Sequence, residues 1–98
     1  MKVLKLDNKE KGVLQLEEML SMEISIMIAH NLRKIRKNKK MTQSEVAELA
    51  NITRVTYSRL ETARGVVSLQ TLLKLAIALN VTVDELLTGV LDAMRSKN

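Results

Sequence analysis

The segment from residue 41 to residue 61, MTQSEVAELANITRVTYSRLE, places the strongest constraint on the fold of this chain. Thr42 is a hydroxyl N-cap, and Glu45 three residues later completes a capping box. Asn51 interrupts the apolar run that follows, and asparagine tolerates the left-handed conformation of a tight turn. Thr53 then caps a second segment, in which the apolar residues Tyr57 and Leu60 recur at helical spacing. The segment therefore predicts two short helices joined by a tight turn.

The two predicted helices each have an apolar side and a polar side. We expect the inward-facing residues to be Val46, Ala47, Leu49, Ala50, Ile52, Tyr57 and Leu60. The other face of the second helix carries Arg54, Thr56, Ser58 and Arg59, which are residue types that hydrogen-bond to base edges and phosphates. Two helices of which the second presents such a face are typical of DNA-binding helix-turn-helix units.

Positive charge is concentrated around these two helices. The chain has a formal charge of +5, and residues 30–80 alone carry ten lysines and arginines against three glutamates. A basic run such as KIRKNKK is often only a solvated helix face. Its position directly before the two-helix segment favours a phosphate-facing surface instead.

The composition indicates a single all-α domain of 98 residues. Proline is absent, and helix-forming residues are abundant. Absence of cysteine excludes disulfides and thiolate metal sites. His30 has neither a second histidine for a metal nor a nucleophile at catalytic spacing, so we expect a surface role for it. The sequence thus predicts no enzyme, no metal and no cofactor. With no long apolar run and no signal-peptide core, the expected location is cytoplasmic, away from membranes.

The N-terminal region allows more than one interpretation. Residues 1–6 alternate basic and apolar side chains and predict a short strand, residues 7–12 predict a turn, and residues 13–22 predict a short amphipathic helix. Ser21 and Ser25 are both candidate caps for the next helix, over residues 25–39. A single continuous helix through the region is the alternative. We therefore divide the chain into an extension, residues 1–24, and a DNA-binding domain, residues 25–98.

The remainder of the chain predicts a loop and two further helices. Residues 62–67 form the loop, and Ser68 caps an apolar helix that ends at Asn80. Thr82 caps a single terminal helix. The first helix carries residues expected to wrap a core, which are Leu69, Leu72, Leu73, Leu75, Ala76 and Leu79. The second carries more apolar surface than a small terminal helix needs to hold itself down, from Val83, Leu86, Leu87, Val90, Leu91 and Met94.

Four motifs in order resemble one known family, the Cro/C1-type helix-turn-helix domain of the Xre regulators and phage repressors. The motifs are LRKIR, MTQSEVAELANIT, SRLE and SLQTLLKLAIALNVTVDELL. The resemblance covers residues 28–87 and implies a five-helix, lambda-repressor-like domain, to which residues 1–24 are an addition. Two departures stand out: the family commonly has glycine where Lys40 stands and near Ala63, and proline where Val67 stands.

The resemblance also implies roles for individual residues. Gln43 would contact the DNA backbone at the start of its helix, and Arg36 would pair with Glu61 after the recognition helix. Base contact is expected most for Arg54, while Lys37 is expected to contact phosphate. The full set expected to bind DNA is Lys37, Gln43, Thr53, Arg54, Val55, Thr56, Ser58, Arg59 and Arg64.

Two hypotheses about function follow. The first is a sequence-specific transcriptional regulator, most simply a repressor, that binds a palindromic operator in double-stranded DNA as a homodimer. The surplus of apolar residues in the terminal helix motivates the dimer, with the N-terminal segment as a second candidate surface. The alternative is an antitoxin-like protein-interaction module in which residues 1–24 bind a partner protein.

Overall fold

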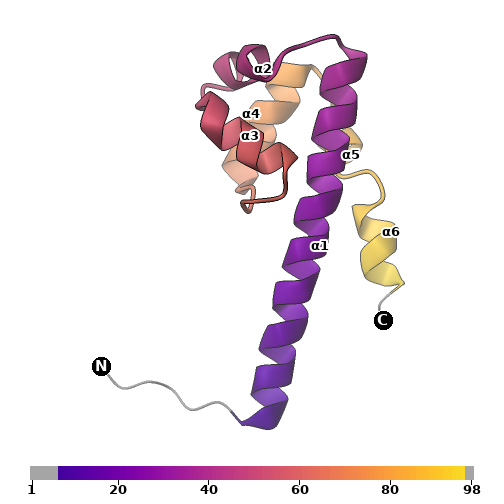
Figure 1. Ribbon diagram of the computed structural model, residues 1–98. Helices are drawn as coiled ribbons and strands as arrows, with labels where there is room; N and C mark the ends of the chain where they lie inside the picture. The colour runs from indigo at the N-terminus through magenta and orange to yellow at the C-terminus, as the bar shows by residue number, and fades with distance from the viewer. Residues whose placement is uncertain (1–6, 97–98) are drawn as a thin grey trace.

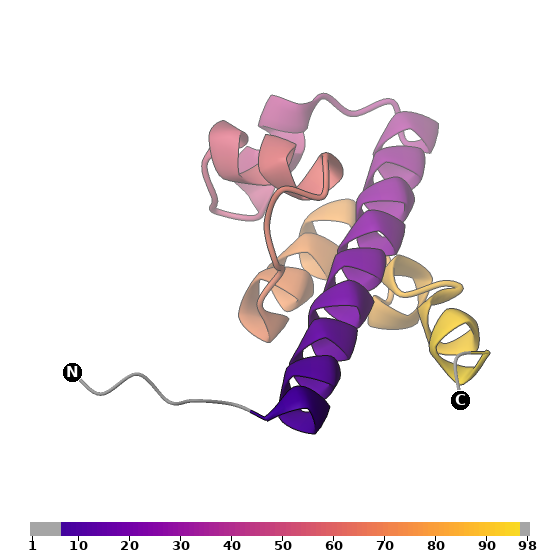
Figure 2. The ribbon, with the colours of Figure 1, turned by 60° about the horizontal axis from the view of Figure 1, so that its bottom comes forward.

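The computed structural model describes residues 7–96, which are helical with no strand (Figure 1). The helices are α1 (Asn8–Asn38), α2 (Gln43–Leu49), α3 (Arg54–Glu61), α4 (Leu69–Leu79), α5 (Val83–Leu86) and α6 (Val90–Arg95). Helices α2 to α5 gather around the C-terminal half of α1, and α6 lies alongside the middle of α1 (Figures 1 and 2). The predicted all-α, lambda-repressor-like fold is confirmed.

One uninterrupted helix, α1, replaces the turn and two helices predicted for the N-terminal region. Asp7 caps it, because its Oδ1 accepts a hydrogen bond of 2.7 Å from the Glu10 backbone N–H. The turn predicted for residues 7–12 is therefore wrong, and Ser21 and Ser25 lie within the helix instead of capping one. The alternative of a continuous helix is correct. The predicted strand, residues 1–6, lies outside the described residues.

The two-helix segment folds as its caps predict. The Thr42 Oγ1 accepts from the Glu45 N–H, and the Glu45 carboxylate accepts from the Thr42 N–H, which is the predicted capping box. Asn51 has the expected left-handed φ of 55°. Val46, Ala47 and Ala50 are buried, but Leu49 was wrongly placed in the core. It sits at the C-terminal end of a seven-residue helix, and its side chain is 62% exposed.

Helix α4 supplies the largest share of the core from one element, although less of it than predicted. Leu72, Leu75, Ala76 and Leu79 are buried against α1, α2 and α5. Leu69 and Leu73 lie at the edge of the buried face of α4 and are exposed, so their core placement was wrong. Ser68 caps the helix and Asn80 ends it with φ 53°, both as predicted. Only one face of a helix this short meets the rest of the domain.

The predicted terminal helix is interrupted at Gly89. The chain forms α5, then Gly89 adopts φ 82°, and α6 begins at Val90. A side chain at this position would be strained by the backbone and would lie 3.1 Å from the Met27 Cε. Leu86 and Val90, on either side of the break, are both buried, while Leu91 on α6 stays exposed.

Two of the four non-glycine residues with positive φ occupy the positions where the family commonly has glycine. Lys40 has φ 55° and Ala63 has φ 57°. For L-residues other than glycine this conformation costs about 1–2 kcal/mol. Ala63→Gly is therefore expected to raise the free energy of unfolding by about 1 kcal/mol, measured by urea denaturation. The matched control is Ala78→Gly within α4, which should lower it by a similar amount; equal effects of both substitutions would contradict the argument.

Among the helices of residues 7–96, none combines the length and the apolar character needed to span a bilayer, α1 included.

Candidate nucleic-acid interface

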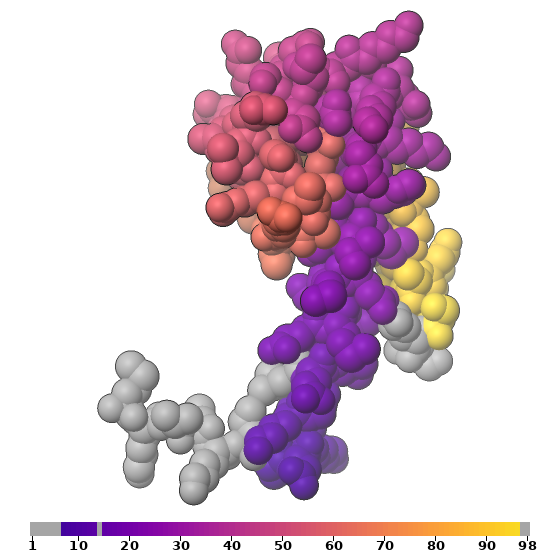
Figure 3. All heavy atoms as spheres, viewed as in Figure 1, coloured from indigo at the N-terminus to yellow at the C-terminus, as the bar shows by residue number. Residues whose placement is uncertain are grey.

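Helix α3 is held by one face and exposed on the other. Tyr57, Leu60 and Glu61 are buried where α3 packs on α1 and α2. On the outward side Arg54, Val55 and Arg59 are exposed. Neither arginine side chain makes a hydrogen bond or ion pair with a residue the structure describes. The helix thus presents two free guanidinium groups from a rigid support, and α2 and α3 together form one end of the molecule (Figure 3).

The start of α3 is organised by two threonines. The Thr53 Oγ1 accepts a hydrogen bond of 3.1 Å from the Thr56 N–H and donates to the Thr56 Oγ1 at 2.8 Å. This arrangement caps the helix and leaves the Thr56 hydroxyl hydrogen available to a further acceptor. Both residues are exposed beside Arg54, while Ser58, one turn further, is half-buried.

The Arg36 guanidinium and the Glu61 carboxylate form the predicted ion pair. The Arg36 Nε donates to Oε2 at 2.6 Å and Nη2 donates to Oε1 at 2.9 Å, a bidentate geometry. The Arg36 Nη1 also donates to the Met41 carbonyl at 3.0 Å. The side chains are only 12% and 3% exposed. Because Arg36 belongs to α1 and Glu61 ends α3, the pair fastens the recognition helix to the longest helix.

Gln43 joins this pair, a contact that sequence reasoning missed. Its Nε2 donates to the Glu61 Oε1 at 3.3 Å. Gln43 is the first residue of α2, so Glu61 receives hydrogen bonds from α1 and α2, the two helices on which α3 mainly packs. The two residues are 18 positions apart in the sequence, and no sequence pattern signals a hydrogen bond between them. A donor role toward phosphate would use the remaining Nε2 hydrogen.

The electrostatics of the network follow from burial and pairing. Burial alone would raise the pKa of Glu61, but the hydrogen bonds that its carboxylate accepts outweigh burial and lower the pKa. Hydrogen bonding to Glu61 raises the pKa of Arg36. The Tyr57 hydroxyl is buried beside the pair with no aligned hydrogen bond to a described residue. Burial and the nearby carboxylate raise the pKa of Tyr57, so it stays neutral.

The other residues expected to bind DNA lie on neighbouring elements. Arg64 is exposed in the loop after α3, where its backbone N–H donates to the Arg59 carbonyl at 2.9 Å. Lys37 is exposed in the last turn of α1. The structure therefore brings residues 53–59 together on one helix and its cap, with Arg64 following and Lys37 and Gln43 on separate helices. His30 is exposed, in agreement with its expected surface position.

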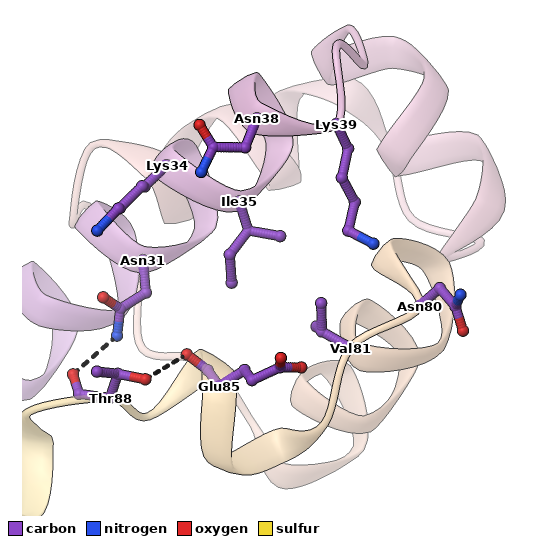
Figure 4. A pocket seen from close by; sticks show the side chains of 9 residues that line it. All are labelled: Asn31, Lys34, Ile35, Asn38, Lys39, Asn80, Val81, Glu85 and Thr88. Atoms are coloured by element: carbon purple, nitrogen blue, oxygen red, sulfur yellow. Dashed lines mark hydrogen bonds between the residues drawn. The ribbon is translucent and has the colours of Figure 1, made fainter.

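A pocket of about 360 Å³ lies along α1, on the side of the connection between α4 and α5 (Figure 4). The Asn31 Nδ2 donates to the carbonyls of Leu86 and Thr88 at 2.8 and 3.0 Å, which ties α5 and the following turn to α1. The pocket is lined by Asn31, Lys34, Ile35, Asn38, Lys39, Asn80, Val81, Glu85 and Thr88. The Asn31 amide and the Thr88 hydroxyl in this lining are already used in holding the fold, and the lining residues include no nucleophile paired with a base.

Comparison with known proteins places these features in a family. The family described as "Helix-turn-helix" matches residues 32–86. An uncharacterized HTH-type transcriptional regulator of Bacillus subtilis, YqaE, is 38% identical over 63 residues, 64% of this chain. The match spans about half of that relative, 54% of its length.

Two solved structures of named regulators are also similar to this chain. The restriction-modification controller protein C.AhdI from Aeromonas hydrophila is 32% identical with a TM-score of 0.62, over 63% of this chain and 94% of that one. The clp gene regulator ClgR from Corynebacterium glutamicum is 27% identical with a TM-score of 0.67, over 76% of this chain and 79% of that one. This chain belongs to the Cro/C1-type helix-turn-helix family, whose model its residues 32–86 match.

Proposed function

We propose that the protein is a sequence-specific DNA-binding regulator of transcription in the cytoplasm. The observation that carries this proposal is the outer face of α3, where Arg54 and Arg59 are exposed and unpaired among the described residues. A helix held rigidly on one side, with free guanidinium groups on the other, suits insertion into the major groove. The likeness to C.AhdI and ClgR, both named as regulators, supports the same function.

Each expected DNA contact has a physical role in this proposal. Arg54, in the first turn of α3, donates two hydrogen bonds to the O6 and N7 of a guanine, and Val55 and Thr56 offer methyl groups to thymine. Lys37, Gln43 and Arg64 contact phosphates and position the helix. Arg59, Ser58 and Thr53 bind at the edge of the same groove, to phosphate or base.

The proposed assembly is a homodimer that reads a palindromic operator. Two copies of α3 would enter successive major grooves about 34–36 Å apart. Occupancy of the operator would repress transcription by excluding polymerase. In this proposal residues 25–98 are the DNA-binding domain and residues 1–24 are an extension of it that contacts another protein chain.

The specificity test compares Arg54→Ala with Lys37→Ala. Removing a base contact should cost about 1–3 kcal/mol at the preferred site and flatten the preference among sites. Removing a phosphate contact should weaken binding to all sites about equally. Selection of bound sequences from a random duplex pool, followed by titration of the best and scrambled sites, measures both. The reverse pattern would place the base-reading surface elsewhere.

The alternative is a module that captures a different protein through residues 1–24. One observation favours it: the N-terminal half of α1 carries exposed apolar side chains, including Leu16 and Met19. A gel-shift titration with duplex DNA separates the two functions, since the alternative on its own predicts no binding at low salt.

A further inference from the structure

The N-terminal half of α1, residues 8–23, extends beyond the body formed by the other helices and is here called the arm (Figures 1 and 3). The radius of gyration is 15.8 Å, whereas a compact chain of this length has about 13 Å. On the arm Val13, Leu16, Met19 and Met22 are 50–65% exposed. Most of the stability of helices in proteins comes from packing an amphipathic face. The exposed apolar side chains of the arm are therefore suited to pack against a further surface.

A groove of about 370 Å³ lies where the arm joins the body. Its apolar lining comes from the arm side and from the start of α4, chiefly Leu20, Ile24, Val66, Leu69 and Leu72. Val66 and Leu69 are 76% and 71% exposed, so they form an open apolar rim. Figure 2 shows α4 and α6 flanking this part of α1 on opposite sides.

The arm's apolar residues lead into the groove. Val13, Leu16 and Leu20 follow the spacing of one helix face, three and then four residues apart. Leu20 belongs both to this stripe and to the groove lining. A second helix lying antiparallel along the stripe would therefore place its own first turns in the groove.

We infer that this second helix is the arm of another copy of the same chain. The arm and groove are on one molecule, so two copies related by a two-fold axis near Leu16–Leu20 would each insert an arm into the other's groove. The inference rests on the proposed homodimer and identifies its contact surface. The exchanged arms form most of this surface. Helix α6, on which Leu91 is exposed, packs on α1 beside them.

The apolar area available matches what such a dimer needs. Full burial of a Leu- or Val-sized side chain at 1.5–3 kcal/mol corresponds to roughly 60–120 Å², so each half-exposed residue contributes roughly 50 Å². The arm, the groove rim and α6 together provide eight such residues per copy, or roughly 400 Å². A standard interface buries about 800 Å² per partner, of which a little over half is apolar.

The charge of the arm disfavours a lipid surface as the occupant. Residues 8–23 carry four glutamates and two lysines, whereas helices that lie on anionic membranes are rich in lysine and arginine on the polar face. Leu16→Glu in the arm should therefore leave any sedimentation of the protein with anionic vesicles unchanged.

The first experiment measures mass by light scattering at micromolar concentration without DNA. The full chain should be a dimer, and Leu16→Glu and Leu69→Glu should each raise the dimer dissociation constant at least 100-fold and give monomers. Ile77→Glu is the matched control: Ile77 is 79% exposed on α4 but does not line the groove, so this variant should stay dimeric. Circular dichroism at the α-helical minimum checks that the body stays folded in every variant.

The second experiment uses the absence of cysteine in the chain. Two single-cysteine variants, Gly12→Cys and Val66→Cys, are mixed and oxidised. A Cβ at Gly12 meets no atom within 4 Å, so the substitution fits the arm. Antiparallel exchange should give a disulfide-linked heterodimer in this mixture, and much less with Ile77→Cys in place of Val66→Cys.

Three results would overturn the inference: a monomer at all concentrations, a dimer lost only in Leu91→Glu or Ile77→Glu, or cross-linking through Ile77 and not Val66. These readouts contain no DNA, so they are independent of the proposed function. A dimer with exchanged arms that binds no duplex would refute the proposed DNA binding alone. Duplex binding by a strict monomer would refute the inference and the proposed homodimer, while DNA binding itself would stand.

Discussion

Glu61→Ala is expected to lower the free energy of unfolding by about 3 kcal/mol, because it leaves the Arg36 guanidinium buried without its bidentate acceptor. Arg36 is 12% exposed and retains only the Met41 carbonyl as an acceptor. Gln43 also loses its hydrogen bond to the carboxylate. Urea denaturation followed by circular dichroism measures the loss. As a control, Glu48→Ala removes an exposed glutamate of α2 and should change stability by less than about 0.5 kcal/mol.

A double-mutant cycle separates pairing from simple truncation. Arg36→Ala alone strands the carboxylate, and the double variant strands neither charge. We expect Arg36→Ala with Glu61→Ala to cost clearly less than the sum of the two single substitutions, by about 1–3 kcal/mol. Additive costs would mean that the two side chains stabilise the domain independently, in spite of their 2.6 Å contact.

The same pair makes stability depend on acid. Because the folded pKa of Glu61 lies below its ordinary value of 4.5, its contribution is fully present above that value and is lost as the pH falls through the lower, folded pKa. The unfolding free energy of the full chain should therefore decrease below about pH 4.5 more steeply than that of Glu61→Gln. Arg36 keeps its charge throughout this range, since its pKa is raised.

Binding to duplex DNA is expected to weaken about 1,000-fold when salt rises from 50 to 200 mM, if about six phosphates are neutralised per dimer. The ten lysines and arginines of residues 30–80, against three glutamates, provide the charge for this. Fluorescence anisotropy with a labelled duplex measures the slope of the logarithm of affinity against the logarithm of salt. Lys37→Ala should make that slope shallower by about one.

The matched variant for the salt experiment is Lys9→Ala, which removes a lysine from the arm and should leave the slope unchanged. Affinity that does not respond to salt would contradict a phosphate-facing surface around α3. A slope that changes equally for Lys9 and Lys37 would mean that the charge acts only through the net charge of the chain.

The sequence predicted the parts of the fold that depend on local hydrogen bonds. Thr42, Thr53, Ser68 and Thr82 all cap helices as expected, because a hydroxyl that accepts from an N–H three residues ahead leaves a recognisable spacing. Asn51 and Asn80 end helices with positive φ for an equally local reason. These signals placed α2, α3 and α4 almost to the residue.

The predictions that were wrong concern features that depend on contacts beyond one turn of helix. Gly12 and the polar residues around it resemble a turn, so the cap at Asp7 was not foreseen, and only the structure shows the helix continuing through them. Gly89 breaks the terminal helix with a positive φ, at a position where an added Cβ would lie 3.1 Å from the Met27 Cε. Leu49, Leu69 and Leu73 have apolar side chains at helical spacing, yet which side of a short helix is covered depends on its neighbours.

The candidate interface was predictable to a different degree. The exposed face of α3 followed from periodicity, since Tyr57 and Leu60 mark the inward side. The Arg36–Glu61 pair came from family resemblance, and its geometry is confirmed. The Gln43 hydrogen bond to Glu61 was unforeseen, because a side chain expected to face phosphate is also within reach of a neighbouring helix.

Because α1 is continuous, the direction of the arm's apolar stripe is fixed relative to the face of α1 that contacts α3. A single helix links the arm to the body, so among residues 8–38 there is no hinge at which one end could turn independently of the other. Each residue of an α-helix advances about 100°, so one alanine inserted near Ser21 would swing the arm's apolar stripe by about that angle relative to α3. Seven inserted alanines would restore the alignment to within about 20° while adding about 10 Å of length. The arm therefore cannot rotate independently of the body. The direction in which it leaves the body is set by α1, the same helix that holds α3 in place through Arg36.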